Sequence, residues 1–310
     1  MPKQTVLITG GAGFIGSHLC QKLLSGNYRV ICLDNFITGS RNNLKPFSKD
    51  RNFRLEVCDV SRGMEISGKL DYVLHCASLA SPKDYLNFPI QTLEVGSQGT
   101  LNALNLAKKN KAVFMLFSTS EVYGDPLEHP QKESYWGHVN SIGVRGCYDE
   151  SKRFAEAITM AYYRVHKVDT RIARIFNAYG PRMRHNDGRV VPNFIEQALK
   201  GKPLTVYGQG RQTRSFCYID DLTDGLLRLM LSKENLPVNL GNPREFTIMQ
   251  LVNLVLKLTG SKSKIAFRRL PQDDPRKRQP NIAKARKLLG WEPTVTLEDG
   301  LKRTISWFQG

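Results

Sequence analysis

The sequence has no long hydrophobic segment. Its longest wholly apolar stretch is residues 112–117, whereas a helix needs about 20 predominantly apolar residues to span a bilayer. The first residues, Met-Pro-Lys-Gln, lead directly into a strand-like run and lack the charged and then apolar layout of an export signal. The sequence therefore argues against a membrane-spanning helix, and we expect a cytoplasmic protein.

Closely spaced cysteines and histidines are also absent. The six cysteines form no C-x-x-C pair, and the six histidines show no spacing typical of metal ligands. Several cysteines lie inside apolar, strand-like runs, which is typical of small core residues in a reducing compartment. We expect neither a disulfide framework nor a metal site.

Acidic residues are few relative to basic ones. The chain has 28 Asp and Glu against 45 Lys and Arg, a net charge of +17. Such a charge favours anionic partners: nucleic acid, an acidic membrane or phosphorylated metabolites. The basic residues are scattered, and their densest cluster is residues 275–278, so a solvated basic surface is a better interpretation than a nucleic-acid footprint. We expect a small-molecule partner, with no nucleic-acid or membrane partner.

The rest of the composition is typical of a globular protein, with 41% hydrophobic and 24% charged residues. A chain of 310 residues suggests two domains, or one domain with a sizeable appendage. Its first half alternates short β-rich runs with helical patterns, which favours a doubly wound parallel α/β sheet, the Rossmann fold. The predicted strands are residues 5–9, 29–34, 53–58, 71–76, 112–118 and 170–176. The predicted helices are residues 15–24, 92–109 and 150–166.

This alternation ends near residue 180, where turn signals such as Gly-Pro and Asn-Asp-Gly become frequent. Helical patterns return at residues 192–200, 220–231, 247–258, 282–289 and 297–308. We therefore predict an NAD-binding domain over residues 1–180 that also carries the catalytic residues. A smaller, mostly helical substrate lobe is predicted over residues 181–310, with the chain crossing between the lobes in its second half.

A glycine-rich turn connects the first predicted strand to the first predicted helix. Gly10, Gly13 and Gly16 allow, in order, a tight turn, close approach of backbone to a diphosphate, and close helix–strand packing. Free N–H groups at the helix start favour negative charge there. Asp34 ends the next strand, where a carboxylate can accept both ribose hydroxyls and repel a 2′-phosphate, which predicts NAD rather than NADP. A purely structural glycine turn is the alternative.

Asp59 ends the third predicted strand. A carboxylate there can accept the adenine amino group, or it can simply cap the next helix. The predicted NAD site also includes further residues around the glycine turn and the strand ends: Phe14, Ile15, Asn35, Thr38, Gly39, Val60, Cys76 and Ser78.

Tyr148 and Lys152 are four residues apart at the start of a predicted helix, which places them on one face. A nearby ammonium lowers the pKa of a tyrosine from ~10, so we expect Tyr148 to act as a base while Lys152 also holds the nicotinamide ribose. Thr119 lies at the end of the fifth strand, and ligands bind at strand carboxyl ends in open parallel sheets. The alternative is a surface tyrosine beside a solvated lysine.

The glycine pattern, the Ser-Thr-Ser strand end at residues 118–120 and the Tyr-x-x-x-Lys pair resemble the extended short-chain dehydrogenase/reductases that act on nucleotide sugars. Within that superfamily, six longer strings resemble the UDP-glucuronate decarboxylase family: residues 119–126, 135–140, 147–150, 174–177, 186–190 and 272–275. The resemblance covers nearly the whole chain. It implies NAD-dependent decarboxylation of UDP-glucuronate to UDP-xylose through a 4-keto intermediate, with NAD recycled within each turnover.

The same resemblance implies roles for further residues. Glu121 and Arg278 are expected near the sugar carboxylate, and Ser120 stands where related 4,6-dehydratases carry the aspartate that expels water. The implied substrate-binding residues are Tyr85, Asn177, Val190, Tyr207, Arg214 and Arg278. Each arginine is alternatively a surface charge, and Glu121 a structural partner.

Two further questions stay open at this point. The chain is alternatively a 4-epimerase, a 4,6-dehydratase or a nucleotide-binding protein without turnover, and a decarboxylase can also release the 4-keto-pentose. In the resembling enzymes two helices pack against their copies across a two-fold axis, which implies a homodimer. We expect Ala155, Ile158, Ala161 and Tyr162 to form its apolar stripe, unless this stripe faces the chain's own sheet.

Overall fold

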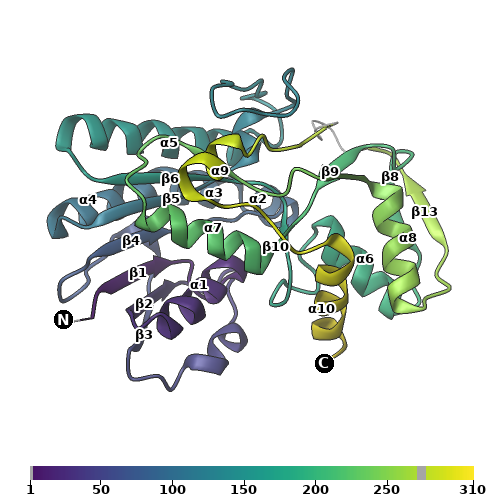
Figure 1. Cartoon of the computed structure of the whole chain (residues 1–310), viewed down its shortest axis with the longest axis horizontal. Coiled ribbons are helices and arrows are strands. Elements are labelled where there is room, and N and C mark those ends of the chain that lie inside the picture. Colours follow the sequence, from purple (N-terminus) through teal and green to yellow (C-terminus); the bar gives the residue numbers. More distant parts are fainter. Residues whose placement is uncertain (1–2, 271–276) are drawn as a thin grey trace.

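The structure, a computed structural model, describes residues 3–270 and 277–310. Its centre is a seven-stranded sheet in the order β11-β6-β5-β4-β1-β2-β3, with every neighbouring pair parallel (Figure 1). This is the doubly wound arrangement that the alternating pattern predicts. The strands are β1 (Thr5–Thr9), β2 (Arg29–Asp34), β3 (Phe53–Val57), β4 (Tyr72–His75), β5 (Val113–Thr119), β6 (Thr170–Ile175) and β11 (Val238–Leu240).

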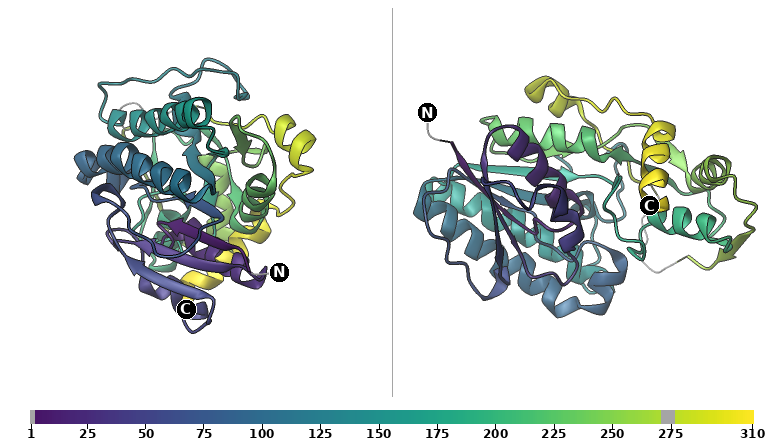
Figure 2. Two further views of the ribbon diagram at one scale, coloured as in Figure 1. Left: turned by 90° about the vertical axis from the view of Figure 1, so that its left-hand side faces the viewer. Right: turned by 90° about the horizontal axis from the view of Figure 1, so that it is seen from below.

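Helices cover both faces of this sheet (Figure 2). Because side chains alternate along a strand, Val6 and Ile8 of β1 join one core and Leu7 joins the other. On the first face lie α1 (Phe14–Ser25), α7 (Ile219–Leu231) and α9 (Ala283–Leu289); on the second lie α3 (Pro89–Glu94), α4 (Thr100–Asn110) and α5 (Gly146–His166). The apolar face of each helix is thereby removed from water, which drives the layering.

Two of these helices differ from their predicted bounds. The helix predicted at residues 92–109 is broken into α3, a π-helical turn at Val95–Gly99, and α4. The helix predicted at residues 150–166 begins four residues earlier, at Gly146. Tyr148 and Lys152 therefore both lie within its first two turns, on regular helix.

The second half of the chain adds a smaller lobe and returns to the main sheet. The lobe contains α6 (Val190–Leu199), α8 (Ile248–Thr259) and α10 (Leu297–Gln309), while β11 and α7 pack onto the main sheet. Three two-stranded sheets occur as well within the described part of the chain, and the helical patterns did not predict them. They are β7 (Ala178–Tyr179) with β10 (Cys217–Tyr218), β8 (Leu204–Tyr207) with β13 (Ile265–Arg268), and β9 (Thr213–Ser215) with β12 (Glu245–Thr247). Strands of two to four residues are too short to show a periodic pattern.

The loops after the main strands carry four short helical elements. These are η1 (Arg41–Phe47), η2 (Val60–Arg62), α2 (Pro82–Asn87) and η4 (Ser120–Tyr123). Since parallel strands share one carboxyl edge, the loops after β1, β2, β4 and β5 converge there. No helix within residues 3–270 and 277–310 has the length and apolarity needed to cross a membrane.

Candidate active site

The glycine turn after β1 has the conformation that only glycine adopts without strain. Gly10 has a φ of +66°, and a Cβ added to it would lie 2.8 Å from backbone atoms of Ala77. A Cβ on Gly16 would lie 2.3 Å from the Gly10 carbonyl oxygen. Gly13 is the N-cap of α1 and makes no side-chain hydrogen bond to the helix, so no capping side chain occupies the helix N-terminus. The turn therefore fits a dinucleotide diphosphate.

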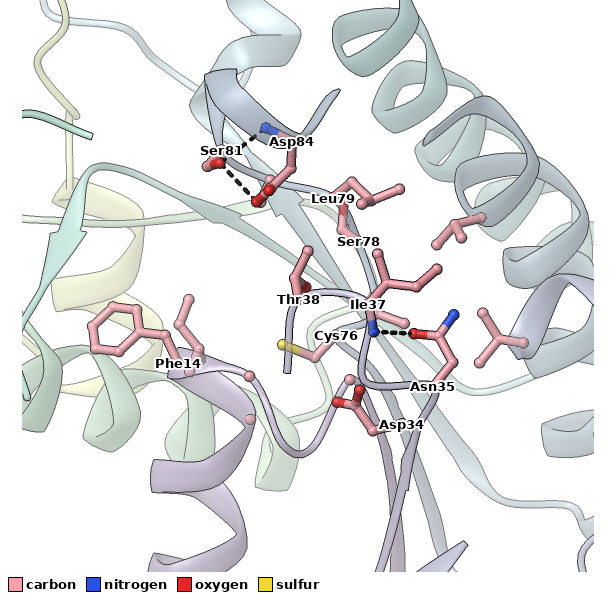
Figure 3. A pocket seen from close by; sticks show the side chains of 18 of the residues that line it. Phe14, Asp34, Asn35, Ile37, Thr38, Cys76, Ser78, Leu79, Ser81 and Asp84 are labelled. Atoms are coloured by element: carbon pink, nitrogen blue, oxygen red, sulfur yellow. Dashed lines mark hydrogen bonds between the residues drawn. The ribbon is translucent and has the colours of Figure 1, made fainter. Parts of the chain in front are cut away.

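A pocket opens beside this turn, between β1, β2 and β4 (Figure 3). Figure 3 shows Asp34 and Asn35 at one end, Ser81 and Asp84 at the other, and Thr38 and Cys76 between them. Twelve of the residues predicted to hold NAD line it: Gly10, Gly13, Phe14, Ile15, Gly16, Asp34, Asn35, Thr38, Asp59, Val60, Cys76 and Ser78. Gly39 lies behind the pocket, where an added Cβ would meet the Asp34 carboxylate at 2.6 Å.

Asp34 is held rigidly at the end of β2. Its Oδ2 accepts a hydrogen bond from the Ala12 N–H at 2.9 Å, and its Oδ1 accepts one from the Phe36 N–H at 2.8 Å. Burial raises the pKa of this carboxyl, and the two N–H donors lower it. Asp34 thus ties the glycine turn to the next strand and presents its carboxyl group at the pocket wall.

Asp59 caps the next helical element, which is the alternative that the sequence left open beside a contact with adenine. It is the N-cap of η2, where its Oδ1 accepts from the Ser61 N–H at 2.9 Å and from the Ser61 hydroxyl at 2.7 Å. Burial raises the pKa of Asp59, but the hydrogen bonds from Ser61 outweigh it and the net shift is downward. The residue also lines the pocket, so capping fixes the orientation of its carboxylate there.

Tyr148 and Thr119 meet at the carboxyl edge of β5. Tyr148 is 5% exposed and is hydrogen-bonded to the Thr119 side chain. Its ring stacks on Tyr85, with ring centroids 5.1 Å apart and an interplanar angle of 9°. The phenol oxygen is thereby held in one position, as a general acid or base requires.

The expectation that Lys152 lowers the pKa of Tyr148 is wrong for this structure. Burial, with Glu121 adding to it, raises the pKa of the Tyr148 phenol above its ordinary value. Lys152 is 4% exposed and donates from Nζ to the Phe117 carbonyl oxygen at 2.9 Å. Burial lowers the pKa of this ammonium to about 8. Desolvation therefore sets the direction of both shifts and favours the neutral phenol of Tyr148.

Glu121 lies between two arginines. Arg278 Nη1 and Arg145 Nη2 each donate to one of its carboxylate oxygens, and Arg278 also donates to the Ser120 hydroxyl at 3.3 Å and to the Gly124 carbonyl at 2.9 Å. Burial raises the pKa of Glu121, but the two guanidinium groups outweigh it and hold the pKa at about 2. Arg278 is 2% exposed, so it is no surface charge. We call Glu121, Arg145 and Arg278 the carboxylate cluster.

Among the described residues, three buried polar atoms of predicted site residues have no hydrogen-bond partner. They are the Tyr85 hydroxyl, Asn177 Nδ2 and Arg278 Nε. Since buried donors without partners are costly, such atoms indicate that a polar ligand completes the site. The other residues expected to bind substrate lie in the second half: Val190 begins α6, Tyr207 ends β8, and Arg214 lies in β9, where Nη1 donates to the Thr213 carbonyl at 2.9 Å. The string at residues 272–275 and Arg276 of the basic cluster fall outside the described residues.

The sequence interpretation missed a charged rim of the pocket. Arg182, Arg184, Asp187 and Arg189 line it from the segment before α6. Arg184 pairs with Asp84 across the pocket, and Arg189 Nη2 donates to Asp187 Oδ2 at 2.8 Å. Four charged residues within eight positions were the available signal. The sequence interpretation also missed Arg145. No motif in the sequence singled this residue out.

Fold and site together define a class, the dinucleotide-binding enzymes of the extended short-chain dehydrogenase/reductase type. In these a buried tyrosine and a lysine one helical turn later lie at the carboxyl edge of the parallel sheet. The model of the NAD dependent epimerase/dehydratase family matches residues 6–241. The chain belongs to this family.

Curated relatives match nearly the whole chain. UDP-glucuronic acid decarboxylase 1 of Xenopus tropicalis is 53% identical over 99% of this chain and 72% of the relative. UDP-glucuronic acid decarboxylase 4 of Arabidopsis thaliana is 51% identical over 98% of this chain and 68% of the relative. Among solved structures, the UDP-glucuronic acid 4-epimerase of Bacillus cereus, in complex with UDP-glucuronic acid and NAD, is 29% identical with a TM-score of 0.87 over 99% of each chain.

Proposed function

We propose that this protein is an NAD-dependent decarboxylase that converts UDP-glucuronate to UDP-xylose. The curated relatives at 53% and 51% identity are named for UDP-glucuronic acid decarboxylation. The observation that carries the proposal is the carboxylate cluster. Two guanidinium groups surround Glu121, whose charge acts on the Tyr148 phenol, and such groups are suited to a sugar that carries a carboxylate.

Bound NAD supplies the hydride acceptor and later returns the hydride. The chain's own residues handle the protons and the developing charge. The phenolate form of Tyr148, held by Thr119, takes the proton of the sugar 4-hydroxyl and becomes the neutral phenol. The resulting 4-ketone makes the sugar a β-keto acid, which loses carbon dioxide and leaves an enolate. Thr119 and the protonated Tyr148 donate hydrogen bonds to that enolate oxygen until the 5-carbon is protonated.

Ser120 and the carboxylate cluster favour decarboxylation over the related reactions. A 4,6-dehydratase needs an acid to expel water, and a serine hydroxyl that accepts from Arg278 is poorly suited to that. A 4-epimerase needs only the oxidation and return of the hydride. Arg278 and Arg145 can orient the substrate carboxylate, while Glu121 opposes it electrostatically.

Product analysis tests the proposal directly. The purified protein is incubated with NAD and UDP-glucuronate labelled at the carboxylate carbon. We expect release of labelled carbon dioxide and a UDP-pentose identified by NMR as UDP-xylose. Release of label together with a 4-keto-pentose and NADH would limit the reaction to oxidation and loss of carbon dioxide. A UDP-uronate that is epimerised at C4 and keeps its label would contradict decarboxylation.

Cofactor choice gives a first prediction. The Asp34 carboxylate lines the pocket, and a 2′-phosphate placed there would meet a like charge, which costs several kcal/mol. We expect NAD to bind at least ~10-fold more tightly than NADP in a fluorescence titration. Asp34→Asn removes this repulsion and should narrow the difference. Equal affinities in the parent protein would contradict the role of Asp34.

We also propose a homodimer, but through a different face from the predicted stripe. Ala155 is 1% exposed and lies in the chain's own core, with Ile158 and Tyr162 packed against it. The helix turns another apolar set outward. Phe154 is 42% exposed, and the adjoining α3 exposes Ile90 at 61%. Since α3 and α5 are in contact, these side chains form one continuous face. A second copy of the chain would bury this face.

Phe154→Asp should therefore give a monomer. A carboxylate in a buried apolar interface is strongly unfavourable, whereas on an isolated chain the same exposed position tolerates it. Light scattering at micromolar concentration measures the mass. Leu288→Asp is the matched control, because Leu288 is 46% exposed on the opposite face of the sheet and should leave the dimer intact. A parent protein of monomeric mass would refute the dimer.

A further inference from the structure

The backbone that carries Arg278 is held by buried side chains to which the reaction described above gives no role. Gln131 lies in the loop between η4 and α5 and is 0% exposed. Its Oε1 accepts a hydrogen bond from the Gln279 N–H at 2.9 Å, and its Nε2 donates to the Glu128 carbonyl oxygen at 2.8 Å. Both polar atoms of the Gln131 amide are therefore bonded to backbone groups, one of which belongs to the residue after Arg278.

A second side chain holds the other half of the same peptide group. Ser215 of β9 is also 0% exposed, and its hydroxyl donates to the Arg278 carbonyl oxygen at 3.4 Å. This carbonyl and the Gln279 N–H belong to one planar peptide unit. Gln131 and Ser215 together thus fix both polar groups of the peptide bond that directly follows the Arg278 Cα atom.

Backbone pairing fixes the register of this segment. The Gln131 N–H donates to the Gln279 carbonyl at 2.9 Å, and the Asn281 N–H donates to the Gln131 carbonyl at 2.8 Å. These two bonds form a parallel bridge between Gln131 and Pro280. Asn239 of β11 joins the pair to the main sheet, because its Nδ2 donates to the Gln131 and Asn281 carbonyls at 3.1 and 3.2 Å.

The placement of this backbone decides where the Arg278 guanidinium lies. The guanidinium donates to oxygens of Ser120, Glu121 and Gly124, which are in η4 or directly after it. A planar group with fixed donor directions reaches such a set of oxygens only from a fixed Cα position. A displacement of about 1 Å can cost ~10²-fold in rate.

We propose that Gln131 and Ser215 are positioning residues for Arg278: by fixing the peptide bond after Arg278 they hold its guanidinium where it can orient the substrate carboxylate. This inference rests on the proposed function, because it takes the substrate carboxylate as the group that Arg278 orients. Ser215 also follows Arg214, a predicted substrate-binding residue, in β9. One short strand therefore carries a residue for the substrate and a support for Arg278.

A positioning role affects one step of the reaction more than the others. Oxidation of the sugar depends on Tyr148 and NAD, whereas the loss of carbon dioxide depends on the orientation of the carboxylate by Arg278. Loosening the Arg278 backbone should therefore slow the release of carbon dioxide and spare the oxidation. A merely structural role would reduce the amount of folded protein, which lowers both rates by the same factor.

Single-turnover kinetics on the NAD-loaded protein separate these two roles. UDP-glucuronate labelled at the carboxylate carbon is mixed with excess protein, and NADH absorbance and labelled carbon dioxide are followed together. Gln131→Met keeps about the same side-chain length and removes both polar atoms of the amide. Ser215→Ala removes only the hydroxyl. If Gln131→Met does not fold, Ser215→Ala decides by the same criteria.

Asn110→Leu is the matched control. Asn110 ends α4, and its Oδ1 accepts a hydrogen bond from the Leu70 N–H at 3.1 Å. The variant therefore loses the same kind of bond as Gln131→Met, from a side-chain oxygen to a distant backbone N–H. Leu70 precedes β4, so this bond lies at the amino edge of the sheet, opposite the site.

We expect Gln131→Met and Ser215→Ala to form NADH at the parent rate and to release carbon dioxide ~10-fold more slowly or worse. Asn110→Leu should match the parent protein in both measurements. In an Arg278→Lys background, Gln131→Met should add no further loss, because a residue that acts through Arg278 has no separate effect once Arg278 is replaced.

Three results would count against the inference. Release of carbon dioxide at the parent rate would show that the peptide bond after Arg278 needs no support. An equal fall in both rates, or a full further loss in the Arg278→Lys background, would assign Gln131 to stability alone. If the parent protein itself releases no labelled carbon dioxide, the proposed function is wrong, and the inference is overturned with it.

Discussion

Replacing Tyr148 by phenylalanine should slow hydride transfer by ~10²–10⁴-fold, the usual cost of losing a positioned acid–base group. The phenol oxygen is the only atom removed, and the ring keeps its stacking on Tyr85. NAD binding should hardly change, because Tyr148 does not line the pocket beside the glycine turn. Formation of NADH absorbance in a single turnover with UDP-glucuronate measures the effect.

Tyr163→Phe is the matched control for this experiment. Tyr163 lies on the same helix, beyond the site, and its loss of a hydroxyl should leave the rate unchanged. Turnover of Tyr148→Phe near the parent rate would show that another group removes the proton. The raised pKa of the Tyr148 phenol adds a condition: because burial favours the neutral form, activity should rise with pH through the neutral range.

Arg278→Lys should retain the charge and lose on the order of 10²-fold in decarboxylation, the scale of effect that misplacing a reacting group produces. The Arg278 guanidinium reaches three oxygens at once, on Ser120, Glu121 and Gly124. A lysine ammonium is a single point and cannot hold that geometry. Release of labelled carbon dioxide from UDP-glucuronate measures the loss, and single-turnover NADH formation separates it from oxidation.

Two further variants sharpen this result. Glu121→Gln keeps the shape of the side chain and removes the charge that opposes the substrate carboxylate, so it should impair the loss of carbon dioxide. Arg286→Lys is the control, because Arg286 pairs with Glu292 at the surface, with side chains 56% and 59% exposed. If Arg278→Lys releases carbon dioxide at the parent rate, Arg278 does not orient the substrate carboxylate. Arg145 and Tyr85 would then be the next candidates for that role.

Local sequence patterns account for some of these features, and the folded structure decides the others. The role proposed for Tyr148 follows from its spacing to Lys152 and from the strand end at Thr119, since both are local patterns. Its ionisation was not, because the pKa of the phenol depends on how much solvent the folded chain excludes. The proposed dimer face shows the same division: period and apolarity located α5, but packing decided that Ala155 faces inward and Phe154 outward.

The sequence by itself determined the parallel sheet, the glycine turn, Asp34 and the tyrosine–lysine pair. Each of these follows from residues only a few positions apart, whose relative placement is fixed by the geometry of a strand, turn or helix. Tertiary structure decided the carboxylate cluster, in which Glu121 meets Arg145 and Arg278 at separations of 24 and 157 residues. It also decided that β11, from the second half, completes the main sheet. Contacts at such separations, and the burial and ion pairs that shift the pKa of Glu121, exist only once distant segments exclude water together.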